Sequence, residues 1–138
     1  MTTAVLDTNV LASGFVRPEP PPGALLAAWR AARFTLITSE HILGELARAF
    51  DEPYFSRHLT PEQRVNNIAL LRAEAAVVPL TVIVHGVATH PEDDPVLATA
   101  LSARADYLVT GDRQLRAVSP FRAVIICTPR EFLDFLAR

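Results

Sequence analysis

The chemistry that this sequence can support rests on acidic residues placed next to predicted secondary structure. Asp7 follows Val5 and Leu6, the end of a predicted buried strand, and Asp112 follows a second short apolar run at 107–109. In an open α/β sheet, ligands bind outside the carboxyl ends of the strands. We therefore expect both carboxylates at one edge of a sheet.

Three further acids are placed to join that edge. Glu45 interrupts the apolar stripe of a predicted helix, where a carboxylate needs a partner. Asp93 and Asp94 directly precede another predicted helix. Carboxylates drawn together repel one another and cannot all stay ionised without a cation. Because hard oxygen ligands favour Mg²⁺ or Mn²⁺, the sequence predicts a metal site formed by Asp7, Glu45, Asp93 or Asp94, and Asp112.

Each acid also has a purely structural alternative. Asp7 and Asp112 suit the N-cap of a following helix. Glu45 is spaced for an i,i+3 ion pair with Arg48. Pro95 at the first helical position makes Asp94 the natural N-cap, which leaves Asp93 freer to face a cation. We favour Asp93 as the third ligand, and the sequence leaves either residue of the pair open.

Strands and helices are expected to alternate along most of the chain. Strands are predicted to end at Leu6 and to cover 34–38, 76–84, 107–109 and 123–127, the third one irregular at Pro79. Helices are predicted at 8–13 (closed by Gly14), at 24–33, after the N-caps Ser39, Thr60, Asp94 and Thr128, and briefly at 113–116. Strands separated by helices indicate a parallel sheet covered on both faces, in one α/β domain over residues 1–138.

All thirteen basic residues are arginine. This excludes Walker-type phosphate loops, Schiff-base chemistry and lysine-dependent phosphoryl acceptors, whereas arginine still binds phosphate bidentately. Arg17, Arg113 and Arg116 lie near the expected mouth of the site, and ordinary surface charge is the alternative for each. The proline-rich segment 17–23 is expected to be a surface loop. His85 and His90 lack metal-ligand spacing, so we expect them to be solvated.

Bulk composition narrows the class of protein. A chain of 138 residues that is 50% hydrophobic can bury a core and is not disordered. No apolar run reaches the ~20 residues of a membrane span, and no export signal is visible, so we expect a cytoplasmic protein. The single Cys127 allows no internal disulfide and is expected in the core. The formal net charge of −2 argues against a generally basic nucleic-acid-binding surface, although acidic metal ligands would themselves lower it.

Four motifs together resemble the PIN domain. They are Leu-Asp-Thr-Asn-Val at 6–10, Ser-Glu-His-Ile-Leu-Gly-Glu-Leu at 39–46, Glu-Asp-Asp-Pro-Val-Leu-Ala-Thr-Ala at 92–100 and Asp-Tyr-Leu-Val-Thr-Gly-Asp at 106–112. More narrowly, the chain resembles the VapC-like group of toxins from toxin–antitoxin pairs. The resemblance spans nearly the whole chain. It implies a Rossmann-like α/β/α sandwich and a Mg²⁺- or Mn²⁺-dependent endoribonuclease, so the RNA substrate comes from the resemblance alone.

The resemblance also assigns roles to residues. The first, second and fourth acids of the family fall on Asp7, Glu45 and Asp112, and the third falls on the pair Asp93 and Asp94. Many relatives carry Asn where this chain has Asp94. Asn9 and Thr110 match positions that usually support the site. An antitoxin partner and a homodimer are implied by the family as well.

Two other classes of function compete with a nuclease. A phosphoacceptor signalling domain is also a parallel α/β sheet, but it needs an acidic pair after the first strand and a late lysine, and this chain has neither. The other class is a catalytically idle binding or regulatory module whose acids only cap helices and form ion pairs. A metal titration distinguishes this module from a nuclease.

Overall fold

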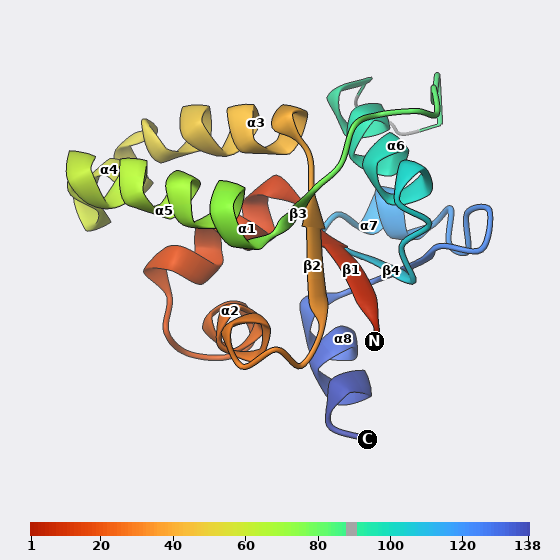
Figure 1. Ribbon diagram of the computed structural model, residues 1–138, viewed down its shortest axis with the longest axis horizontal. Helices are drawn as coiled ribbons and strands as arrows, with labels where there is room; N and C mark the ends of the chain where they lie inside the picture. Colours follow the sequence, from red (N-terminus) through yellow and green to blue (C-terminus); the bar gives the residue numbers. More distant parts are fainter. Residues whose placement is uncertain (88–90) are drawn as a thin grey trace.

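The computed structural model describes residues 1–87 and 91–138 and contains a five-stranded parallel sheet of order β3-β2-β1-β4-β5 (Figure 1). The strands are β1 (Thr3–Leu6), β2 (Thr35–Thr38), β3 (Ala76–Val77), β4 (Tyr107–Val109) and β5 (Ile125–Cys127). The helices are α1 (Thr8–Val16), α2 (Pro22–Arg30), α3 (Glu40–Phe50), α4 (Pro53–His58), α5 (Pro61–Glu74), α6 (Asp94–Ser102), α7 (Arg113–Arg116) and α8 (Pro129–Leu136), with a 3₁₀ turn, η1 (Pro91–Asp93), before α6. The predicted α/β class is confirmed.

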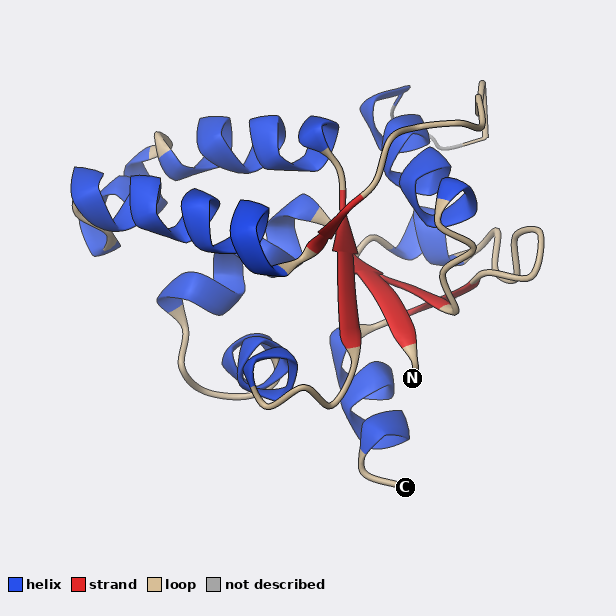
Figure 2. Cartoon of the chain, viewed as in Figure 1, coloured by secondary structure: helices blue, strands red, loops and turns tan. Residues whose placement is uncertain are grey.

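Helices cover both faces of the sheet. Figure 2 shows α1 to α5 on one side of the strands and α6 with α7 on the other. Because helices cover both faces, the central strand is buried: Ala4, Val5 and Leu6 of β1 are fully inaccessible to solvent. α8 closes the amino end of the sheet, where the Phe132 ring lies 5.1 Å from that of Phe34. The chain therefore forms the predicted α/β/α sandwich.

The helix starts follow the capping residues in the sequence. Ser39 Oγ accepts a hydrogen bond from Ile42 N at 3.4 Å. Thr60 with Gln63, and Thr128 with Glu131, form complete capping boxes in which each side chain accepts from the backbone N–H of the other residue. Local chemistry thus fixes where α3, α5 and α8 begin, as predicted.

The predicted end of the first helix is wrong. α1 continues through Gly14 to Val16, because Gly14 serves helix packing instead of termination. A Cβ at Gly14 would lie 2.8 Å from Cγ of Leu26, so the absent side chain lets α1 and α2 approach. α2 also begins earlier than predicted, at Pro22, since proline suits the first position of a helix, and it ends at Arg30 before the left-handed Ala32.

The predicted strand 76–84 is mostly loop. After β3, Val78 N still donates to Thr38 O at 2.9 Å, and pairing then ends because Pro79 has no N–H. The amides of Thr81 and Val82 donate instead to Ser102 Oγ, at 2.9 and 3.2 Å. The last strand is also shorter than predicted, because the left-handed Ala123 lies in a turn before β5.

Two helical segments differ from the sequence prediction. α4 is not among the predicted helices, although Pro53 suits the first position of a helix and begins it. α6 begins at Asp94 directly after η1, and Asp94 is not its N-cap: the cap position is Asp93, with no side-chain capping bond. Of the predicted loop histidines, His85 is exposed and His90 lies outside the described residues.

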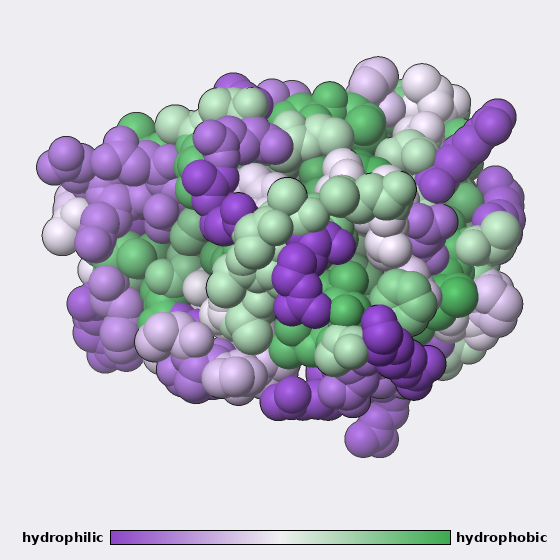
Figure 3. Space-filling model, turned by 60° about the horizontal axis from the view of Figure 1, so that its bottom comes forward, coloured by the Kyte–Doolittle hydropathy of each residue, from purple (hydrophilic) through white to green (hydrophobic). Residues whose placement is uncertain are grey.

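Within the described ranges, no helix is long and apolar enough to cross a membrane. On the face shown in Figure 3, hydrophobic and strongly hydrophilic residues are interspersed, in keeping with the balanced charge of the chain. Cys127 is buried as predicted, and burial raises the pKa of its thiol to about 12, so the thiol stays protonated at neutral pH.

Candidate functional site

The register of the two central strands places Asp7 next to Thr110. Leu6 of β1 pairs with Val109 of β4, and the N–H of Asp7 donates to Val109 O at 3.0 Å. The Thr110 hydroxyl, fully buried, donates to Oδ2 of Asp7. The other carboxylate oxygen, Oδ1, accepts from Val10 N at 2.9 Å and so caps α1. Both oxygens of Asp7 are therefore held at the carboxyl end of the sheet.

Asp112 is attached to the same hydroxyl. Its N–H donates to Thr110 Oγ1 at 3.0 Å, and its Oδ1 accepts from Gln114 N at 2.9 Å at the start of α7. Asp7 and Asp112 thus both cap helices, as their structural alternatives required. Each also lines the cavity described below, so capping does not remove either carboxylate from the site.

Glu45 belongs to α3 and reaches the site at the start of α1. Its Oε1 accepts from Thr8 Oγ1 at 3.3 Å and lies 3.0 Å from Nε2 of His41. The side chain is 20% exposed. The alternative ion pair with Arg48 is not formed in the part of the chain that the structure describes, because Glu45 turns toward α1 instead.

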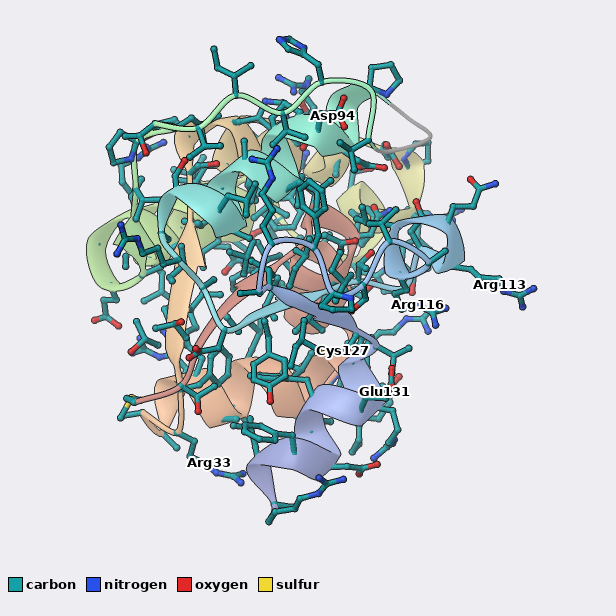
Figure 4. The ribbon with its side chains drawn as sticks, turned by 90° about the vertical axis from the view of Figure 1, so that its right-hand side faces the viewer. Arg33, Asp94, Arg113, Arg116, Cys127 and Glu131 are labelled. Atoms are coloured by element: carbon teal, nitrogen blue, oxygen red, sulfur yellow. The ribbon has the colours of Figure 1, made fainter. Side chains whose placement is uncertain are left out.

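The two adjacent acids before α6 point in different directions. Asp94 is buried, and its Oδ2 accepts from Gly86 N at 2.9 Å, which ties the preceding loop to α6 (Figure 4). Asp93, one residue earlier in η1, lines the same cavity as Asp7. The predicted N-cap role of Asp94 is wrong, and the choice of Asp93 as the third ligand stays a prediction.

One cavity of about 600 Å³ joins these carboxylates at the carboxyl edge of the sheet. It is lined by Asp7, Thr8, Asn9, Glu45, Arg48, Ala49, Glu52, Asp93, Val96, Gly111 and Asp112. The lining side chains that can ligate a cation offer oxygen atoms, which suits Mg²⁺ or Mn²⁺. Across residues 1–87 and 91–138, no three acidic, His or Cys side chains converge closely enough to form a metal site.

The electrostatics of Asp7 reflect its neighbours. Burial raises the pKa of Asp7 above its ordinary value, and the charges of Asp112 and Glu45 raise it further, against the lowering effect of the hydrogen bonds from Thr110 and Val10. The charges of Asp112 and Glu45 therefore act on the Asp7 carboxylate, although the three residues come from three separate segments.

The arginines predicted at the mouth do not line the cavity. Arg17 Nε donates to Tyr54 Oη at 3.2 Å, and Arg113 extends outward from α7 with Arg116 beside it (Figure 4). Asn9 does line the cavity. Thr110 contributes indirectly, because its hydroxyl donates to Asp7, which lines the cavity.

Sequence reasoning missed two charged residues of the cavity, Arg48 and Glu52. For Arg48 the signal is its spacing of three residues from Glu45, which puts both side chains on one face of α3, whereas Glu52 lies beyond the end of that helix and has no such signal.

Comparison with known proteins identifies the family. A family model for the PIN domain matches residues 3–114. The chain belongs to the PIN domain family. The matched range contains all five candidate acids. This PIN domain is also 24% identical to the uncharacterized protein MJ1680 of Methanocaldococcus jannaschii, over 94% of this chain and 88% of the relative.

Solved structures share the fold of this PIN domain. PAE2754 from Pyrobaculum aerophilum aligns with a TM-score of 0.66 at 17% identity, covering 99% of this chain and 90% of that one. VapBC2 from Rickettsia felis, bound to a promoter DNA fragment, aligns at 0.62 and 14% identity, covering 92% and 98%. VapC20 of Mycobacterium tuberculosis, a toxin that cleaves the sarcin–ricin loop, aligns at 0.60 and 16% identity, covering 88% and 98%. These three structures thus share the fold of this PIN domain.

Proposed function

We propose that this PIN domain, as a single domain over residues 1–138, is a metal-dependent endoribonuclease that acts in the cytoplasm as the toxin of a toxin–antitoxin pair. One observation carries the proposal: Asp7, Glu45, Asp93 and Asp112, which come from four segments of the chain, line one cavity at the carboxyl edge of the sheet. The helix caps and hydrogen bonds of these carboxylates do not by themselves require that all four line one cavity.

Mg²⁺ or Mn²⁺ is the proposed cofactor, held by Asp7, Glu45, Asp93 and Asp112. When bound, such an ion polarises a phosphodiester oxygen and lowers the pKa of a coordinated water. The chain itself supplies orientation. Thr110 fixes Asp7 and Asp112 through a single hydroxyl, and the Thr8 hydroxyl donates to Glu45, which lies 3.0 Å from Nε2 of His41.

The competing hypothesis is an idle α/β module whose acids are structural. It is supported by the capping bonds of Asp7 and Asp112 and by the hydrogen bond from Thr8 to Glu45, but it does not require that these carboxylates and Asp93 line one cavity. The deciding experiment incubates purified protein with total cellular RNA, with and without Mn²⁺, and maps the ends produced. Cleavage that requires both Mn²⁺ and the Asp7 carboxylate supports the nuclease. Intact RNA under all conditions supports the idle module.

An apolar groove supports the proposed homodimer. It lies between α3 and α5, holds about 780 Å³ and is lined by apolar side chains that include Phe50, Val65 and Ile68. Val65 is 68% exposed, although it lies among apolar neighbours. The rims carry the ion pairs Arg64–Asp51 and Arg72–Glu40, which leaves little net charge to oppose a second copy. We assign the groove to a second copy of this chain.

An antitoxin protein is the further partner that we propose. This proposal rests on the VapC-like motifs and on the fold shared with VapBC2. No surface of this chain is assigned to it.

A further inference from the structure

One face of α3 carries a polar stripe that runs along the cavity. His41, Glu45 and Arg48 are spaced by four and three residues, which places them on one side of α3, and Glu52 follows two residues after the helix ends at Phe50. The opposite side is buried through Ile42, Leu43, Leu46 and Phe50. Glu45, Arg48 and Glu52 all line the cavity, so Arg48 brings a positive charge into a lining that otherwise carries carboxylates.

Arg48 is not engaged by the acids around it. Glu45, three residues earlier, is held by Thr8 and His41. Asp51, three residues later, pairs with Arg64 at 3.2 Å. Among the described residues, no hydrogen bond or ion pair joins Arg48 to a protein group. A guanidinium beside several carboxylates yet paired with none is available to bind an anion from solution.

The position of the guanidinium is defined by the helix. A Cβ placed on Gly44 would lie 3.6 Å from Nη1 of Arg48, so the side chain folds back by one turn over the glycine, next to Glu45. The side chain is exposed, which leaves its donors accessible from the mouth of the cavity. Neither Arg17, which donates to Tyr54, nor Arg113 lines the cavity.

A phosphodiester brought to a cavity lined by Asp7, Glu45, Glu52, Asp93 and Asp112 meets strong repulsion of like charge. A planar guanidinium compensates, because its forked donors match two phosphate oxygens. We infer that Arg48 is the phosphate-binding residue of this site and that it positions the RNA backbone beside the acids. This inference rests on the ribonuclease function proposed above.

A rival role for Arg48 is to neutralise the acids without touching RNA. The two roles predict different consequences of Arg48→Gln. If Arg48 only balances charge, the variant binds Mn²⁺ more tightly and keeps the KM for RNA. If Arg48 binds phosphate, KM rises about ten- to hundredfold, because a charge-assisted hydrogen bond to the substrate is lost.

The test measures cleavage and binding separately. Cleavage of a single-stranded RNA oligonucleotide with Mn²⁺ gives kcat and KM for the wild type, Arg48→Gln and Arg48→Lys. Binding of the same oligonucleotide is measured against salt concentration in the cleavage-deficient Asp7→Asn background, with and without Arg48→Gln. The matched control is Arg33→Gln, which removes an exposed arginine at the opposite end of the sheet (Figure 4).

We expect Arg48→Gln to reduce the slope of log K against log salt by about 0.7, the value for one lost phosphate contact on a single strand. Arg48→Lys should keep the slope and recover only part of the affinity, since it restores charge without the fork. Arg33→Gln should match the wild type. An Arg48→Gln protein with unchanged KM and slope, beside an active wild type, overturns this inference and leaves the ribonuclease proposal intact. A wild type that neither cleaves nor binds RNA overturns both.

Discussion

Thr110 and Asp7 are joined by a hydrogen bond between residues 103 positions apart in the sequence. The Thr110 hydroxyl donates to Oδ2 of Asp7 and accepts from the N–H of Asp112, so one buried oxygen links the ends of β1 and β4 to the start of α7. This link fixes the relative position of two of the four carboxylates proposed to hold the metal.

Replacement of Thr110 by valine tests that link. Valine keeps the shape but leaves the Asp7 oxygen and the Asp112 N–H without this partner, so the free energy of unfolding should fall by about 1–3 kcal/mol. Mn²⁺-dependent cleavage should fall about 10–100-fold, as for other groups that orient metal ligands. Thr110→Ser should retain most activity. Thr99→Val, which removes another fully buried hydroxyl, should lower stability but spare cleavage by the folded protein. Equal cleavage by Thr110→Val and the wild type would contradict the orienting role.

Asp7→Asn should separate metal binding from folding. The amide can still accept from Val10 N, so the variant should fold, but it cannot contribute a charge to a cation. We expect saturating Mn²⁺ to raise the Tm of the wild type and not that of the variant, and cleavage to fall by at least about a hundredfold. Asp134→Asn, an exposed change on α8, is the matched control and should behave as the wild type. A full Mn²⁺ shift in Asp7→Asn would rule out Asp7 as a ligand.

Asp7→Asn also tests how the free energy of unfolding depends on pH in the absence of metal. Burial raises the pKa of Asp7 above its ordinary 3.8, so the folded protein holds this proton more tightly than the unfolded chain does. The contribution of Asp7 to stability is therefore complete below pH 3.8 and is lost as pH rises through the raised pKa. Asn does not titrate. In urea denaturation with EDTA, stability of Asp7→Asn relative to the wild type should rise with pH across this window and then level off. Parallel curves would contradict the raised pKa.

Two helical glycines should respond oppositely to alanine. A Cβ at Gly23 in α2 would lie 2.3 Å from Pro18 O and 2.4 Å from Arg17 O, both backbone atoms, so Gly23→Ala should cost about 3 kcal/mol. A Cβ at Gly44 in α3 comes no closer than 3.6 Å to another side chain, so Gly44→Ala should gain about 0.5–1 kcal/mol from helix propensity. Thermal unfolding of the two variants measures both effects. Similar Tm values for the two variants would show that the backbone of residues 17–18 moves aside at little cost in free energy.

Val65→Glu should report on the proposed homodimer. The residue is exposed in the groove between α3 and α5, so a charge there should leave the fold of one copy intact and oppose a second copy. Sedimentation should show a wild-type dimer and a Val65→Glu monomer. Ile83→Glu changes another exposed aliphatic residue, outside the groove, and should remain dimeric. A dimer that survives Val65→Glu would place the interface elsewhere.

Local patterns were sufficient to predict much of the fold. Ser39, Thr60 and Thr128 cap helices because their hydroxyls lie within reach of backbone N–H groups three residues ahead, an interaction that sequence neighbours decide. Because strands and helices alternate along the chain, the sequence also predicted a parallel sheet. The apolar run before Asp7 likewise placed this carboxylate at a strand end.

Tertiary structure decided what depends on distant partners. Gly14 continues α1 because Leu26 of α2 packs against it, and after Pro79 ends the strand pairing the amides of Thr81 and Val82 donate to Ser102 of α6. Asp94 turns to Gly86, Glu45 turns to His41 and Thr8, and Arg48 is left in the cavity without a protein partner among the described residues. The sequence by itself determined which side chains could bind a cation, since that follows from residue type and local position. Which of them share one cavity was decided only by packing, since neighbours in space compete for the same donors and acceptors.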